Sequence, residues 1–235
     1  MEKSIISTNM IKELSRLHVI TKLSNLNNKF NCMPYYKNYA AVSGFVHNVS
    51  NHEDAVRDIL ISEDLSQIEM KQSKKTFESW IEKPELSTIM PINTFISQPC
   101  GKNDSPDFII KLSNNFILPI ECKSSTNTIP LYNSGGVKHN YMYIFSSNIT
   151  NETVTYMGSA IITLQQQELI DAHIKEARER DEVLNKKLRD LDINKRGISY
   201  YTRPMIGQSG GHIYTNYFTH ENRLRDKEDV LKIVS

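Results

Sequence analysis

Apolar residues recur at helical spacing in three parts of the chain, separated by more irregular segments. The first set consists of Ile11, Leu14, Leu17, Val19, Leu23 and Leu26. This spacing predicts helices over residues 8–26, 52–61 and 164–192, because side chains three or four apart share one helix face. We expect Asn27 and Asn28 to end the first helix, since asparagine hydrogen-bonds the backbone in non-helical conformations.

Short apolar runs predict strands in the middle of the chain. Residues 92–96 form one such run, and residues 140–146 are almost continuously apolar or aromatic, which is typical of a strand buried on both faces. A further strand is expected within residues 153–163, where Gly158 indicates a bulge or a close approach of two backbones. Residues 198–203 and 212–218 give the C-terminal part a strand-and-loop character. Helices and strands together predict an α/β domain with a long helix and a β-rich C-terminal part.

The long helix over residues 164–192 has two interpretations. Its apolar positions are Ile170, Ile174, Ala177, Leu184, Leu188 and Leu191, with Asp181 interrupting them. The pattern suits a helix docked on the sheet or standing out as an arm, and it also suits a coiled-coil-like dimer element. We favour docking or an arm, because the repeat is short and contains a polar break.

Composition narrows the class of protein. The 235 residues include 28 basic and 27 acidic side chains, and no run of eighteen apolar residues predicts a membrane span. The N-terminus lacks the apolar core of a signal peptide, and three widely spaced cysteines form neither a disulfide framework nor a zinc motif. These features predict a cytoplasmic protein with no membrane association. A net charge of +1 argues against a nonspecific nucleic-acid binder, although a site-specific enzyme can concentrate its lysines in one cleft.

Residues 105–125 carry the most specific chemistry. They form two apolar runs joined by a polar turn at residues 113–115, which predicts a hairpin. Strand side chains alternate between faces, so Glu121 and Lys123 point the same way and Cys122 points oppositely. The hairpin would return the chain so that Asp107 lies near Glu121. Two carboxylates beside a lysine suit Mg²⁺, a metal-bound water and a phosphate group.

A simpler interpretation of the same residues is structural. Asp107 follows a proline and would cap a turn, while Glu121 and Lys123 would form a solvated pair on an edge strand. Ile117 and Pro119 lie on the face of that pair, which indicates that the face is partly covered. Cys122 shares the opposite face with apolar neighbours and is expected to be inert core.

The sequence Pro106-Asp107, followed after a strand and turn by Glu121-Cys122-Lys123, resembles the PD-(D/E)xK motif of nucleases. The flanking segments, residues 98–105 and 124–125, are similar to those of type II restriction endonucleases. The resemblance implies Mg²⁺-dependent hydrolysis of DNA phosphodiester bonds. It also implies a restriction-endonuclease-like core with a mixed central sheet flanked by helices. Residues 1–235 would form one nuclease domain, with the core at about residues 50–165 and embellishments at both ends.

The resemblance assigns roles to individual residues. Asp107 and Glu121 would bind the metal together with the carbonyl of Cys122, and Lys123 would orient or help deprotonate the attacking water. Glu53, on the inward edge of the predicted helix 52–61, has two equally weighted interpretations. It is either an acid that favours the helix N-terminus or a further acid directed toward the metal site.

Two loops with short polar side chains and glycines are candidates for contacts to bases. The loops cover residues 133–136 and 208–212, and an ordinary flexible loop is the favoured interpretation of each. The predicted DNA contacts are Asn133, Ser134, Lys138, Arg203, Gln208, Ser209 and His212.

The expected partner is double-stranded DNA. A palindromic site would favour a homodimer, because protein symmetry mirrors site symmetry. The resemblance alone implies a cognate DNA methyltransferase. Two other functions remain open: a repair or junction-resolving nuclease with the same core, and a DNA-binding module that does not cleave.

Overall fold

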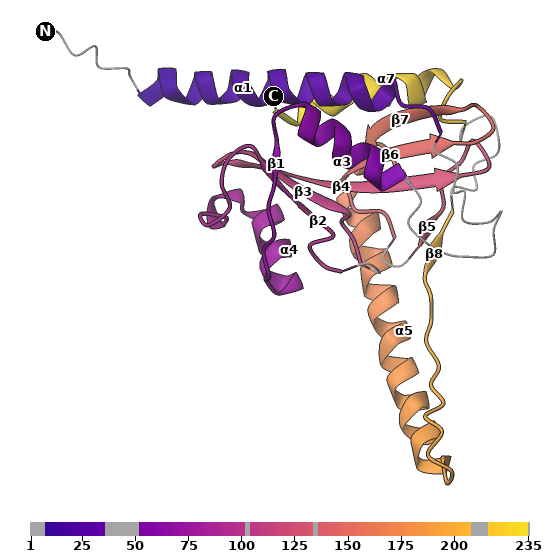
Figure 1. Ribbon diagram of the computed structural model, residues 1–235. Coiled ribbons are helices and arrows are strands. Elements are labelled where there is room, and N and C mark those ends of the chain that lie inside the picture. Colours follow the sequence, from indigo (N-terminus) through magenta and orange to yellow (C-terminus); the bar gives the residue numbers. More distant parts are fainter. Residues whose placement is uncertain (1–7, 36–51, 102–103, 134–135, 208–215, 235) are drawn as a thin grey trace, which may run out of the picture.

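A six-stranded mixed sheet forms the centre of the protein. The computed structural model describes residues 8–35, 52–101, 104–133, 136–207 and 216–234. The strands lie in the order β1-β2-β3-β4-β6-β7, with parallel pairing between β1 and β2 and between β4 and β6 (Figure 1). Their bounds are β1 (Ser66–Gln67), β2 (Thr94–Ser97), β3 (Phe108–Ser113), β4 (Phe116–Ser125), β6 (Met142–Ser147) and β7 (Glu152–Met157). The predicted α/β class with a mixed sheet is confirmed.

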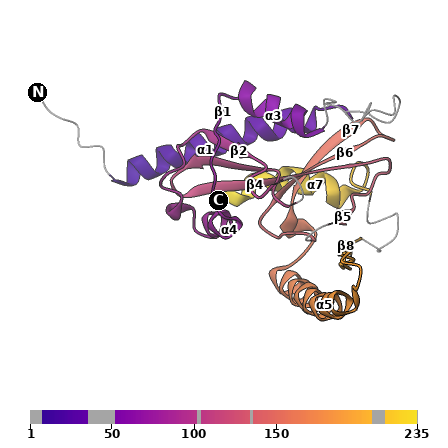
Figure 2. The same cartoon turned by 60° about the horizontal axis from the view of Figure 1, so that its bottom comes forward.

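Helices cover both faces of this sheet. Helices α1 (Thr8–Asn31) and α3 (His52–Ser62) pack on one face, which we call the α1 face. Helix α4 (Lys74–Glu82) packs on the other, the α4 face, and α5 (Leu164–Leu191) extends away from the body (Figure 2). The remaining elements are a second, two-stranded sheet of β5 (Tyr132–Asn133) and β8 (Met205–Ile206), helix α7 (Glu221–Asp229), and the short 3₁₀ helices η1 (Pro84–Leu86), η2 (Gly158–Ala160) and η3 (Val230–Val234). In the described residues, no helix is both long enough and apolar enough to cross a membrane.

The hairpin of β3 and β4 forms with the predicted faces. Phe108 pairs with Ile120 and Lys111 with Ile117, so the chain turns at residues 114–115. Alternating side chains then divide between two cores. On the α1 face, Phe108, Ile110, Leu118, Ile120 and Cys122 pack with α1 and α3, whereas Ile109 and Ile117 pack on the α4 face with Phe77 and Trp80.

Helix α1 continues beyond its predicted end. The expectation that Asn27 and Asn28 terminate it is wrong, because the helix runs to Asn31. The buried Asn27 side chain donates to the carbonyl of Lys227 and accepts from the hydroxyl of Thr155. Asn31 also donates to that hydroxyl, at 2.7 Å. These tertiary bonds satisfy the amide groups without breaking the helix, so context overrides local preference.

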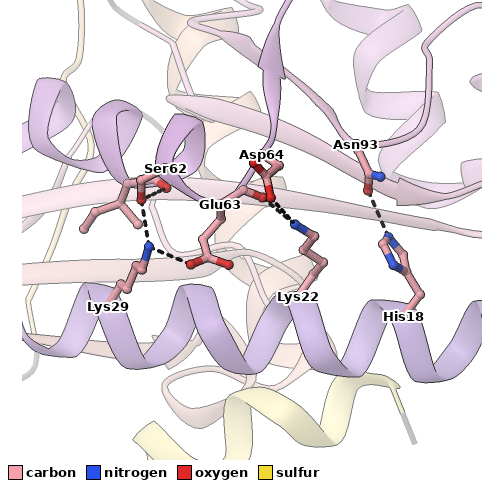
Figure 3. Close-up of polar contacts among 8 residues, drawn as sticks. His18, Lys22, Lys29, Ser62, Glu63, Asp64 and Asn93 are labelled. Atoms are coloured by element: carbon pink, nitrogen blue, oxygen red, sulfur yellow. Dashed lines mark hydrogen bonds and ion pairs between the residues drawn. The ribbon is translucent and has the colours of Figure 1, made fainter.

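Polar contacts attach α1 to the chain that follows α3 (Figure 3). Lys29 forms an ion pair with Glu63 at 2.6 Å, and Lys22 donates to the Glu63 carbonyl at 2.6 Å. His18 bonds the side chain of Asn93 at 3.0 Å, just before β2. Together with the apolar stripe of Val19, Leu23, Leu26 and Phe30, these contacts make α1 part of the main core.

Gly158 is a close-packing site, one of the two roles predicted for it, but the strand expected within residues 153–163 ends just before it, at Met157. A Cβ atom there would lie 1.9 Å from the backbone carbonyl oxygen of Lys138. Only glycine permits this approach, which brings the end of β7 against the loop before β6. The geometry fixes where α5 leaves the sheet, because η2 and α5 follow directly.

The expected β-rich C-terminal part is wrong in the residues that the structure describes. Only the two-residue strand β8 forms there, and α7 follows as a helix. Residues 198–204 form no strand; they follow α5, where Asn185 bonds the backbone of Tyr200 and Asp181 that of Thr202. Residues 212–215 of the second predicted strand lie outside the described residues.

Candidate active site

Asp107 lies at the end of the hairpin that the sequence predicts. It precedes β3 directly, one residue beyond the last register pair, Phe108 with Ile120. Its Oδ2 accepts a hydrogen bond from the backbone N–H of Cys122 at 2.7 Å. The carboxylate is therefore held at the Glu121 end of β4, as expected. The N–H and carbonyl of one strand residue project to the same edge, so the Cys122 carbonyl is directed toward this edge as well.

Glu121 and Lys123 form a largely buried pair on the α4 face. Lys123 Nζ lies 2.7 Å from Glu121 Oε1, and the two side chains are only 12–13% exposed. The interpretation as a solvated edge pair is therefore wrong. The second oxygen, Glu121 Oε2, is buried and has no hydrogen-bond partner among the described residues. An unpartnered buried carboxylate oxygen is costly, so Oε2 is available to a further donor or to a cation.

Glu53 reaches the same place from α3. Its Oε2 accepts a hydrogen bond from Gln98 Nε2 at 2.9 Å, while the backbone N–H of Gln98 donates to the Asp107 carbonyl at 2.6 Å. Gln98 thus connects Glu53 to Asp107. Glu53 also lies in the first turn of α3, so its position agrees with both sequence interpretations. The structure brings it close enough for its charge to act on Asp107 and Glu121.

Burial and like charges raise the pKa values of both acids. The pKa of Asp107 is raised from 3.8 to about 7, first by burial and then by the Glu121 charge, against the Cys122 N–H bond. Burial also raises the pKa of Glu121, and Glu53 reinforces this shift, whereas Lys123 and the nearby backbone N–H of Asp107 oppose it. The carboxyl groups of Asp107, Glu121 and Glu53 therefore lie near a single ammonium group, that of Lys123. Their mutual repulsion disfavours the state in which all three are ionised. A proton or a cation stabilises such a cluster.

The residues present fit a hard divalent cation in part. In the described part of the chain, no three His, Cys, Asp or Glu side chains form a ready metal site. Gln98 holds Glu53, and Lys123 holds one oxygen of Glu121. What remains is the carboxylate of Asp107, the free Oε2 of Glu121 and the Cys122 carbonyl. Oxygen donors of these three types suit Mg²⁺, with water completing the coordination.

The predicted DNA contacts are more scattered than the acids. Asn133 lies in β5 opposite Met205, and Arg203 is exposed on the chain that precedes β8. Lys138 Nζ lies 2.9 Å from both carboxylate oxygens of Asp171, so its charge is compensated within the protein. No described contact joins these three residues to the acidic cluster. Ser134, Gln208, Ser209 and His212 lie outside the described residues.

Gln98 is the site residue whose role the sequence does not reveal. It has a φ of 46°, in the left-handed region, which turns its side chain from the end of β2 toward α3. Its partner Glu53 is 45 positions earlier in the chain. A periodicity argument cannot detect this pairing, because it depends on how α3 crosses the sheet.

Comparisons with protein-family models, with curated proteins and with solved structures found no match. The chemistry of the site therefore rests on the contacts described above.

Proposed function

We propose that the protein is a Mg²⁺-dependent endonuclease that hydrolyses phosphodiester bonds of double-stranded DNA at specific sequences, as type II restriction enzymes do. The observation that supports this most is the unpartnered Oε2 of Glu121, buried beside Lys123 and close to Asp107. A purely structural ion pair has no need of a second carboxylate, Asp107, whose pKa is raised beside it, or of a third, Glu53, whose charge acts on both.

The side chains of the site would have distinct tasks. Asp107 and Glu121 Oε2, with the Cys122 carbonyl, would hold Mg²⁺. When bound, the cation would offset phosphate charge and lower the pKa of a coordinated water. Lys123 would leave Glu121 Oε1 to orient that water and to stabilise charge on the phosphate. The Cys122 N–H keeps the Asp107 carboxylate in place, and Gln98 positions Glu53 next to it.

The wider setting belongs to the same proposal. A restriction enzyme that recognises a palindrome would act as a homodimer, beside a DNA methyltransferase, in the cytoplasm. A repair or junction-resolving nuclease would use the same residues. A DNA-binding module without cleavage is less well supported, because such a module would not need the charged cluster.

The proposal is tested by incubating the purified protein with plasmid DNAs of varied sequence, with Mg²⁺ or with EDTA. We expect discrete fragments with Mg²⁺ alone, and none from the Lys123→Ala variant. Lys175→Ala is the matched control, because that lysine pairs with Glu179 on α5 and belongs to no predicted site, so its variant should still cleave. Cleavage of branched DNA alone would indicate a junction-resolving enzyme. Binding without any cleavage would contradict the proposal.

A further inference from the structure

Helix α5 and the chain that follows it form an arm that projects from the body of the protein (Figure 1). We define the arm as residues 164–206. A helix of 28 residues is about 42 Å long at 1.5 Å per residue. Ala177 is the only buried residue of α5. Beyond it, only the side that faces the returning chain, at Asp181, Asn185 and Leu188, is partly covered, and the other sides are exposed. The arm therefore has a large surface that the rest of the described chain does not cover.

Hydrogen bonds make the arm a defined structure. Asn185 and Tyr200 bond reciprocally, with the Asn185 side chain donating to the Tyr200 carbonyl at 2.8 Å and accepting its N–H at 2.7 Å. Asp181 accepts from the backbone and hydroxyl of Thr202. At the tip, Asp192 accepts the N–H groups of Arg196 and Gly197 at 3.0 and 2.7 Å. The returning chain is thus attached to the helix along its length.

Charge is distributed unevenly along the arm. The part near the body, residues 164–182, has six acidic and three basic side chains, whereas residues 183–203 have two acidic and six basic ones. The whole chain has a net charge of only +1, so the tip is more positive than the rest of the protein. This concentration is what a site-specific enzyme of nearly neutral total charge would need.

The cations of the tip are exposed and have no acidic partner among the described residues. They are Lys186, Lys187, Arg189, Lys195 and Arg196. Two acidic residues lie nearby in sequence, but Asp192 already accepts two backbone N–H groups. Residues 186, 187 and 189 lie on different sides of the helix, because successive residues are about 100° apart. Cations on several sides of the tip can reach phosphates that curve around it along a nucleic-acid backbone. A single flat face of a folded protein could contact only some of them.

We infer that the tip of the arm binds the phosphate backbone of duplex DNA at a distance from the carboxylate cluster. The inference rests on the proposed nuclease function, because the DNA would be the one that the cluster cleaves. The arm would add affinity without reading sequence, since phosphate contacts position a protein without identifying bases. Exposed apolar residues at the tip, such as Ile193 and Tyr201, would instead suit a second copy of the chain. The experiment separates these two occupants.

The test compares two triple variants of the same helix. The tip variant is Lys186→Gln/Lys187→Gln/Arg189→Gln, and the control near the body is Lys175→Gln/Arg178→Gln/Arg180→Gln. Binding to a fluorescent 30-base-pair duplex is measured in EDTA over a range of NaCl concentrations. A plot of log K against log salt has a negative slope, and each lost phosphate contact makes that slope shallower by about 0.9. We expect the tip variant to lose about two to three units of slope and the control to keep the wild-type slope.

Three results would overturn the inference. These are an unchanged slope in the tip variant, an equal loss in the control, or a loss of dimer mass in light scattering with unchanged DNA binding. Plasmid cleavage by the wild type, measured separately with Mg²⁺, distinguishes the two proposals. Cleavage with an unchanged slope would reject only the role of the arm. A tip-dependent slope without cleavage would reject only the nuclease.

Discussion

Two groups of buried polar side chains lie on the α4 face of the sheet, and they differ in how their polar atoms are satisfied. The hydroxyl of Tyr132 bonds those of Tyr156 and Tyr217 at 2.8 and 3.1 Å. On β4, which β6 separates from β7, Glu121 leaves one buried oxygen without a partner among the described residues, and burial and neighbouring charges raise its pKa and that of Asp107. Both groups are largely shielded from water. The tyrosine hydroxyls replace the lost hydrogen bonds with bonds to one another, whereas Glu121 Oε2 has no such replacement among the described residues.

The difference agrees with the proposal that the tyrosines stabilise the fold and the carboxylates form the working site. Burial raises the pKa values of Tyr132 and Tyr156 well above the usual value, so these phenols stay neutral and can share protons. The Arg223 guanidinium stacks 5.0 Å from the Tyr217 ring centre and closes the group. The carboxylates repel one another, and the fold keeps them together at a cost. Such a cost is typical of sites that bind something in their working state.

The largest expected effect comes from removing one charge of the acidic cluster. Asp107→Asn keeps the size of the side chain but removes repulsion, so we expect thermal stability at pH 8 to rise. Cleavage should fall by roughly 10³-fold or more, which corresponds to about 4 kcal/mol of barrier. Thermal melting and plasmid cleavage measure the two changes. A variant that lost both stability and cleavage would indicate that Asp107 is a structural residue.

The pH dependence of stability should come next in size. Asp107 binds its proton more tightly in the folded protein, with a pKa of about 7 against 3.8 when unfolded. The folded state therefore holds more protons between these values, and the free energy of unfolding should fall as the pH rises from about 4 to 7. Urea unfolding across this range measures the slope. It should be smaller in Asp107→Asn, and an equal slope in both proteins would contradict the assignment.

A smaller effect is expected for Gln98, which touches no reacting atom and acts as a positioning residue. Asparagine tolerates the left-handed backbone at this position, but its side chain is one methylene shorter than that of glutamine. In Gln98→Asn the amide would therefore no longer reach Glu53. We expect cleavage to fall about 10- to 100-fold, as for other residues that orient ligands. The Mg²⁺ concentration for half-maximal cleavage should rise, while thermal stability stays nearly constant. Unchanged Mg²⁺ dependence would show that Glu53 needs no such support.

The smallest effect tests the tyrosine group. Tyr156→Phe removes one of two hydroxyl bonds to Tyr132, so the free energy of unfolding should fall by about 1 kcal/mol. Urea denaturation measures this change. Cleavage at a temperature well below unfolding should equal that of the wild type. Reduced cleavage in a fully folded variant would connect the tyrosines to the site and weaken the contrast between the two groups.

Local pattern determined much of the hairpin and its chemistry. Alternation in residues 105–125 placed Glu121 and Lys123 on one face and Cys122 on the other, and the polar turn returned Asp107 to them. The glycine at position 158 likewise indicated a close approach. These features depend on neighbours within about twenty positions, where strand and turn geometry leaves few alternatives.

Only the tertiary structure decided features that join distant segments. The end of α1 depends on Thr155 and on the carbonyl of Lys227, and Glu53 meets the site through Gln98. The C-terminal chain lies along α5 because Asn185 and Asp181 offer bonds to its backbone. No periodicity in the sequence encodes such pairings. They follow from the way that helices cross the sheet and from which polar groups remain unsatisfied there.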